Sequence, residues 1–322
     1  MSLNPKEIYE KFSQKVLDKN TALILLESII ENSEDNKLRL ESIDILKKIG
    51  INDKYTYQFI ENLLISDSNH EIRKFALDLV YKDHPEKILK LIKWIVKNEM
   101  PYSFLIAVIK TLEIMGNEES KRILIEELKK VKKVKYLNEE KRYENRKYKK
   151  VLKRLFKTSK IETFTHKQIS DIISNFLIIK HLSGKFPNVF FELNPQTALV
   201  EQLDLSNYLE YEVKGTPWGW NNNISNILEI EGLEHLNAIK KLDLSNNQIQ
   251  NIKELGILKS LTHLILSNNK IKDQGNLGFL DDLSNLEYLD LSGNEVVIHL
   301  KTLKLNPKIR IVSKRYWEDL NK

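Results

Sequence analysis

The chain of 322 residues contains no cysteine, which excludes disulfides, zinc–thiolate sites, iron–sulfur clusters and cysteine nucleophiles. Glycine and proline are few, with ten and seven residues, so the chain is not of low complexity. No apolar run approaches the ~20 residues that span a bilayer, and the N-terminus lacks a basic stretch followed by an apolar one. We therefore expect a cytoplasmic protein of about two domains.

Motifs of catalysis and metal binding are also missing. The seven histidines never occur at the H-x-x-x-H or H-E-x-x-H spacing of a helical zinc site. The chain has no glycine-rich phosphate loop, no dinucleotide-binding fingerprint and no G-x-S-x-G nucleophile elbow. The sequence thus predicts a non-enzymatic protein without a metal ion or other cofactor, and directs attention to binding.

Positive charge is concentrated in one segment, residues 129–160, which has 15 Lys and Arg against three Glu. The net charge of the whole chain is +6, so the two flanking parts together are slightly acidic. The high isoelectric point is therefore a property of this segment rather than of the chain.

The first 160 residues contain recurring helix signals. Asn4 before Pro5, with Glu7 following, predicts a capped helix start; further starts are expected at Ser33, at Asp67 or Ser68, at His84–Pro85 and at Pro101. The segments LRLESIDILKKIG (38–50) and FLIAVIKTLEIMG (104–116) align at an offset of 66, and IRKFALDLV (72–80) falls midway. Units of 33–34 residues, each a helix pair, predict an α-solenoid, and the pattern resembles HEAT-like repeats.

The basic segment predicts an amphipathic helix beginning after Asn138. Its apolar residues fall at helical spacing from Tyr148 to Phe156, with four cations expected on the opposite face. These candidate binding residues are Lys147, Lys150, Arg154 and Lys157. Two interpretations remain open: the face binds a phosphate-bearing or acidic partner, such as nucleic acid, an anionic lipid or an acidic protein, or it only solvates the last helix of the solenoid.

Three segments of the C-terminal half superpose residue by residue: IKKLDLSNNQI (239–249), LTHLILSNNKI (261–271) and LEYLDLSGNEV (286–296). All three follow the pattern L-x-x-L-x-L-x-x-N-x-L, with Ile or Val at some of the Leu places, and a degenerate copy, VEQLDLSNYL (200–209), has Tyr208 in the Asn place. The pattern resembles the leucine-rich repeat of the short, SDS22-like class over about residues 198–312. This resemblance implies a parallel concave sheet with the leucines inside and a structural Asn in each turn.

Alternation along each strand predicts which side chains face outward. Stacking the repeats yields a mixed row, Gln202, Lys241, His263 and Tyr288, and beside it an acidic row, Asp204, Asp243, Ile265 and Asp290. The resemblance implies that such a face binds a protein partner, although Asp is also an ordinary residue at these places.

An insertion interrupts the repeats, because the first and second copies are 39 residues apart instead of about 25. The excess contains YEVKGTPWGWNNN (211–223), whose glycines and proline predict a loop that carries Trp218 and Trp220. The two indoles either anchor a partner or fold back over the first repeats.

The sequence therefore predicts two repeat domains. We expect a HEAT-like α-solenoid over 1–160, a capping helix and strand over 161–197, and an α/β leucine-rich repeat solenoid with a C-terminal cap over 198–322. The function expected is that of a non-catalytic adaptor or scaffold that binds protein through the concave face. The alternative is a protein that binds nucleic acid or an anionic surface through the basic helix.

Overall fold

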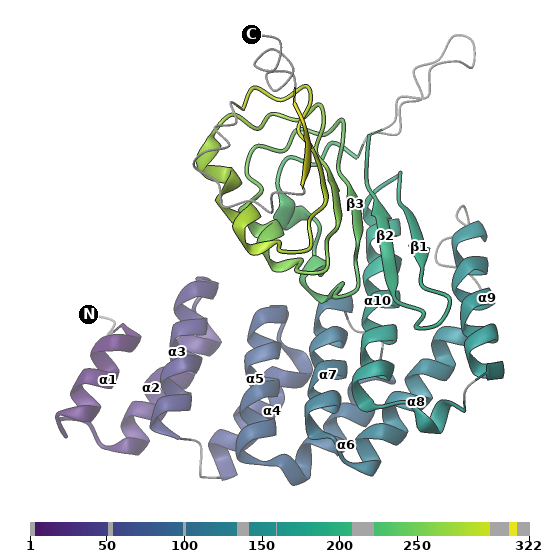
Figure 1. Cartoon of the computed structure of the whole chain (residues 1–322). Helices are drawn as coiled ribbons and strands as arrows, with labels where there is room; N and C mark the ends of the chain where they lie inside the picture. The colour runs from purple at the N-terminus through teal and green to yellow at the C-terminus, as the bar shows by residue number, and fades with distance from the viewer. Residues whose placement is uncertain are drawn as a thin grey trace, which may run out of the picture. The chain divides into compact units, whose positions relative to one another are not determined.

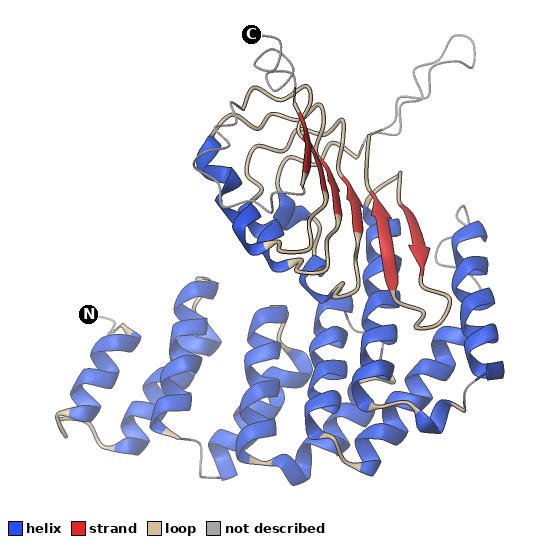
Figure 2. Cartoon of the chain, viewed as in Figure 1, coloured by secondary structure: helices blue, strands red, loops and turns tan. Residues whose placement is uncertain are grey.

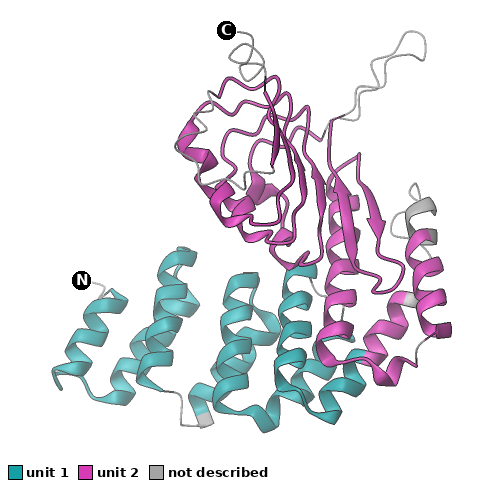
Figure 3. Cartoon of the chain, viewed as in Figure 1, with its two compact units in different colours: residues 1–124 teal, residues 125–322 magenta. Residues whose placement is uncertain are grey.

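The computed structural model describes residues 4–50, 54–98, 101–133, 142–158, 160–207, 222–296 and 309–313. The chain divides into two compact units, residues 1–124 and 125–322 (Figure 3). The domain boundaries expected after residues 160 and 197 remain a prediction, and each unit is described by itself below.

Unit 1 is entirely helical among its described residues. Its helices are α1 (Pro5–Ser13), α2 (Lys19–Asn32), α3 (Asn36–Ile49), α4 (Lys54–Ser66), α5 (His70–Asp83), α6 (Pro85–Ile95), α7 (Tyr102–Met115) and the first part of α8 (Glu118–Lys133). Alternate helices α1, α3, α5 and α7 pack side by side in one row (Figure 1), while α2 packs on α3 and α4 on α5. This stacking of helix pairs confirms the predicted α-solenoid.

An arginine that contacts the preceding helix recurs in successive repeat units. Arg39 Nε donates to the Ile30 carbonyl over 2.6 Å, and 34 residues later Arg73 Nε donates to the Leu64 carbonyl over 2.9 Å. Arg73 also lies 4.2 Å from the centre of the Phe104 ring. Each guanidinium group donates to a carbonyl near the end of the preceding helix. Such a carbonyl has no amide partner within its own helix, so each arginine links its helix to the preceding one.

Helix caps explain where some of these helices begin. Asn4 and Glu7 form the expected capping box. The starts expected at Ser33 and at Asp67 or Ser68 are wrong: the caps are Asp35, which accepts from the amides of residues 37 and 38, and Asn69, which accepts from those of residues 71 and 72. Each true cap is the residue whose oxygen reaches two amides of the first turn.

Unit 2 combines the end of one helix and two further helices with a six-stranded sheet (Figure 2). The helices are the rest of α8, α9 (Arg142–Thr158) and α10 (His166–Lys185), which begins with a capping box of Thr165 and Gln168. The strands, which follow chain order in the sheet, are β1 (Phe190–Leu193), β2 (Val200–Asp204), β3 (Lys241–Asp243), β4 (His263–Ile265), β5 (Tyr288–Asp290) and β6 (Arg310–Val312). Short 3₁₀ segments lie in the connections between β2 and β5: η3 (Ile227–Glu229), η4 (Leu233–His235), η5 (Lys253–Ile257) and η6 (Gln274–Asp282). A further one, η2 (Ile161–Thr163), precedes α10.

The predicted parallel sheet is confirmed from β2 to β6, whereas β1 pairs with β2 antiparallel. The first leucine of each L-x-L motif is the middle residue of β3, β4 or β5 and points into the core: Leu242, Leu264 and Leu289 are at most 1% exposed. Fully burying one such side chain contributes roughly 2 kcal/mol, so the repeated leucines supply the packing that aligns the strands.

The asparagines of the repeats bind backbone groups of the turns, as expected. Asn269 Nδ2 donates to the carbonyls of Leu244 and Leu266 at 2.9 and 3.0 Å, and its Oδ1 accepts from Ile249 N at 3.0 Å. Asn247 and Asn294 make equivalent bonds. The result is a ladder of amides that satisfies backbone groups left without partners by the sheet.

The first member of this ladder is Asn222, which lies outside the superposed repeat segments. Asn222 Nδ2 donates to the carbonyls of Asn188 and Leu205 at 2.7 and 2.8 Å, and its Oδ1 accepts from Asn188 N at 3.0 Å. Its bonds to Leu205 and Ser206 match those of Asn269 to Leu266 and Ser267. Tyr208, which takes the Asn place in the alignment of the degenerate copy, lies outside the described residues; among the described residues the ladder position of this repeat is filled by Asn222, which comes after the insertion.

Candidate functional site

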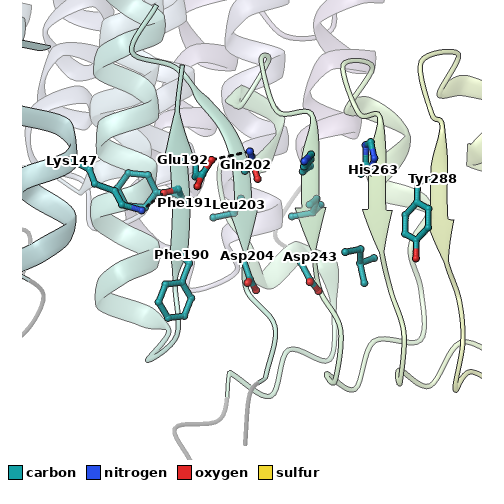
Figure 4. A pocket seen from close by; sticks show the side chains of 13 residues that line it. Lys147, Phe190, Phe191, Glu192, Gln202, Leu203, Asp204, Asp243, His263 and Tyr288 are labelled. Atoms are coloured by element: carbon teal, nitrogen blue, oxygen red, sulfur yellow. Dashed lines mark hydrogen bonds between the residues drawn. The ribbon is translucent and has the colours of Figure 1, made fainter. Parts of the chain in front are cut away.

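Side chains from the five neighbouring strands β1 to β5 and from α9 line an open groove of about 460 Å³ on one face of the sheet (Figure 4). Seven of the eight residues expected on the concave face are among its lining: Gln202, Asp204, Lys241, Asp243, His263, Ile265 and Tyr288. Asp290, the eighth, is the register partner of Ile265 on β5. The strand register thus brings together the residues that the repeat alignment selected.

Strand β1 extends both predicted rows by one residue. Glu192 pairs with Gln202 and so joins the mixed row, and Phe190 pairs with Asp204 and so joins the acidic row. Figure 4 shows Phe190, Asp204 and Asp243 in one line, with Glu192, Gln202 and His263 in the other. At the opposite edge, the register of β6 adds Arg310 to the mixed row and Val312 to the acidic row.

The mixed row changes in chemistry along the sheet. Gln202 Nε2 donates to Glu192 Oε2 over 2.9 Å. Further along, the rings of His263 and Tyr288 stack with centroids 5.8 Å apart, and Arg310 lies 5.9 Å from the Tyr288 centroid. The row therefore runs from an acidic and amide end to an aromatic and cationic end.

Each aspartate of the acidic row also closes its own turn. One carboxylate oxygen, Oδ1, accepts from the amide two residues later over 2.9 Å: Ser206 for Asp204, Ser245 for Asp243 and Ser292 for Asp290. Such Asx turns are a structural use of aspartate, and they leave Oδ2 of each carboxylate for other contacts.

Electrostatics within the acidic row are unfavourable for ionisation. Burial raises the pKa of the Asp243 carboxyl above its usual range, and the nearby charges of Asp204 and Asp290 raise it further. The hydrogen bonds from Ser245 oppose this shift without cancelling it.

The four cations expected on one solvent face of α9 have two different environments. Lys150, Arg154 and Lys157 are exposed, and none of them forms an ion pair with a described residue. Lys147 is half-buried instead, and its Nζ donates to the Phe191 carbonyl over 3.0 Å. The difference arises because α9 packs against β1, where Tyr148 is buried between Phe176 and Phe191.

Two expectations concern parts of the chain that are not described. Trp218 and Trp220 lie outside the described residues, and so does most of the predicted loop 211–223. Asn207 and Asn222 are the described residues on either side of this gap, and both follow β2 in the chain.

Comparison with known proteins bears on these repeats directly. A family model described as Leucine Rich repeats (2 copies) matches residues 259–305, which contain β4 and β5. These repeats are leucine-rich repeats. The chain thus combines a helical repeat part with a leucine-rich repeat part, as the sequence predicted.

Solved structures similar to part of the chain include two leucine-rich repeat proteins of Listeria monocytogenes. An internalin C2 is 28% identical over 29% of this chain and 38% of its own, with a TM-score of 0.25. An internalin, inlF, is 28% identical over 26% of this chain and 24% of its own, with a TM-score of 0.23. The chain therefore spans well under half of either internalin. No curated protein sequence matches it.

Two further properties hold for the described residues. No helix there is both long and apolar enough to cross a bilayer. The same residues contain no group of three histidine or carboxylate side chains that could hold a metal ion.

Proposed function

We propose that this chain is a non-catalytic adaptor or scaffold in the cytoplasm and that its leucine-rich repeat groove binds a segment of a protein partner. Leucine-rich repeat proteins commonly mediate protein–protein interaction, which makes this class of function the starting point. The observation that carries the proposal is the groove itself, because side chains from successive strands converge on one open surface.

The groove has the composition of a binding surface rather than of a filled core. Phe190 is 58% exposed, while His263, Ile265 and Tyr288 are half-buried and remain accessible from the concave side. Aromatic side chains of this kind, surrounded by polar groups, are typical of the residues that contribute most to protein interfaces.

Photo-crosslinking tests the proposal. A photoreactive amino acid replaces His263 or Tyr288 in the groove and, as a matched control, Leu228, which is 65% exposed on η3. We expect the two groove positions to crosslink the same protein in cell extract and the Leu228 position not to do so. Ile265→Arg, which places a bulky charge in the groove, should abolish the adduct. The same adducts from all three positions would refute the groove as the binding site.

A second candidate function rests on the three exposed cations of α9. Lys150, Arg154 and Lys157 lack ion-pair partners among the described residues, so they are accessible to phosphate groups of nucleic acid or of an anionic lipid. Gel-shift measurements with duplex DNA, and flotation with anionic vesicles, should show binding that weakens steeply with salt. Charge reversal at these three positions should then eliminate it, and unchanged binding would exclude this function.

A further inference from the structure

The acidic row has an order of side chains that suggests the chemistry of its partner. Across the register of β1 to β6 it reads Phe190, Asp204, Asp243, Ile265, Asp290 and Val312. Two adjacent carboxylates are thus flanked by two apolar side chains, and a third carboxylate is flanked by Ile265 and Val312. Lys and Arg have complementary chemistry, because each combines an apolar stem with a cationic head.

None of the three carboxylates has a cationic partner among the described residues. Lys241 is two residues from Asp243 on the same face of β3, yet the two side chains do not form an ion pair. The Oδ1 atoms are occupied by the Asx turns, so the Oδ2 atoms of adjacent strands remain as acceptors. The row therefore presents negative charge that the described part of the chain leaves uncompensated.

Spacing allows one cation to contact two of these groups. Asp204 and Asp243 are register partners on adjacent parallel strands, which lie about 4.8 Å apart. A single ammonium or guanidinium group placed between them reaches both carboxylates at hydrogen-bond distance. The pKa of Asp243 is raised mainly by burial and further by the charges of Asp204 and Asp290, and a bound cation would offset that repulsion.

We propose that the groove recognises an extended protein segment whose Lys or Arg side chain lies between Asp204 and Asp243, with apolar side chains of the same segment against Phe190 and Ile265. This inference rests on the proposed function and specifies the partner by its chemistry. Side chains on one side of an extended segment recur about every 6.6 Å, so the flexible stems of Lys or Arg adjust the segment to the strand spacing.

The test uses three capped hexapeptides as probes, with sequences LSKSLS, LSESLS and LSQSLS. Each places one apolar residue on either side of a single central side chain that is cationic, anionic or neutral. Binding to the full chain is followed by the δ1-methyl NMR signal of Ile265 and by the anisotropy of a fluorescein label. We expect the lysine peptide to shift the Ile265 signal, and the glutamate peptide to leave it unchanged.

Matched variants assign the effect to the two carboxylates. The double substitution Asp204→Asn with Asp243→Asn keeps the Oδ1 acceptors of both turns, and it should weaken binding of the lysine peptide by about tenfold or more. Asp281→Asn combined with Asp282→Asn removes the same two charges from exposed residues of η6 and should leave the affinity within about twofold.

The outcomes separate this inference from the proposed function. If the glutamate or glutamine peptide binds as tightly as the lysine peptide, or if the double variant binds it unchanged, the groove does not recognise a cation. The same holds if no peptide binds although photo-crosslinking from the groove captures a protein. If neither peptides nor crosslinks report binding, the proposed function fails as well.

Discussion

Asn222 offers the most direct test of how the leucine-rich repeat unit is held together. Its side chain is 7% exposed and makes three bonds of 3.0 Å or less, to the carbonyls of Asn188 and Leu205 and from the amide of Asn188. Replacing it by alanine leaves these backbone groups without partners in a place that water does not reach. At about 1 kcal/mol for each bond, Asn222→Ala should cost roughly 3 kcal/mol of the free energy of unfolding.

The assay is urea unfolding followed by far-ultraviolet circular dichroism, with hydrogen exchange of residues 200–207 as a local measurement. Asn269→Ala is the positive control, because Asn269 makes the equivalent set of bonds in an interior repeat. Asn237→Ala is the negative control, because Asn237 is exposed, and it should change stability by at most about 0.5 kcal/mol. If Asn222→Ala behaved like Asn237→Ala, the assignment of Asn222 to the ladder would be refuted.

Three further predictions address other features of unit 2. Tyr148 is 1% exposed, and its hydroxyl has no hydrogen-bond partner among the described residues. Tyr148→Phe should therefore leave the unfolding midpoint unchanged or raise the free energy of unfolding by up to about 1 kcal/mol. A clear loss of stability would reveal a partner for the hydroxyl. Gly293 has φ +74°, and an added Cβ would lie 2.0 Å from Asn268 Oδ1. Gly293→Ala should therefore lower the free energy of unfolding by about 1–2 kcal/mol, measured by thermal unfolding. An unchanged unfolding midpoint would contradict this prediction. Because the pKa of Asp243 is raised in the folded state, its ionisation disfavours folding, and Asp243→Asn should be more stable than the natural chain at neutral pH. This advantage should vanish below the pKa of an unfolded aspartate, and an advantage that persisted in acid would need another cause.

The repeats are the part of the fold that the sequence predicts best. Leu242, Leu264 and Leu289 repeat the same position of the same motif, so each copy supports the prediction made from the others, and all three are buried. The outward residues between them follow from alternation alone. For this reason the repeat motif is sufficient to select the groove residues, although it does not specify their partner.

Residues that depend on contacts distant in the sequence were missed or misplaced. Asn222 lies outside the motif because 16 positions separate it from Ser206, whereas Asn247 follows Ser245 by two. Phe190 and Glu192 join the face only because β1 pairs antiparallel with β2, and the pattern of a short apolar strand does not encode its direction.

Lys147 shows the limit of helical periodicity. The spacing of apolar residues on α9 assigns Lys147 to the solvent side with Lys150. However, α9 packs against the edge strand, and a carbonyl 44 residues away accepts a hydrogen bond from the Lys147 ammonium group. Periodicity describes one helix in isolation and contains no information about what covers its polar side.

The place of the insertion has a practical consequence for protein engineering. Asn207 N donates to the Ser245 carbonyl at 3.1 Å on one side of the insertion, and Asn222 resumes the ladder on the other. Both flanks are thus secured to the solenoid independently of the number of residues between them. Foreign sequence of different lengths should therefore be accepted between Asn207 and Asn222 without altering the repeats.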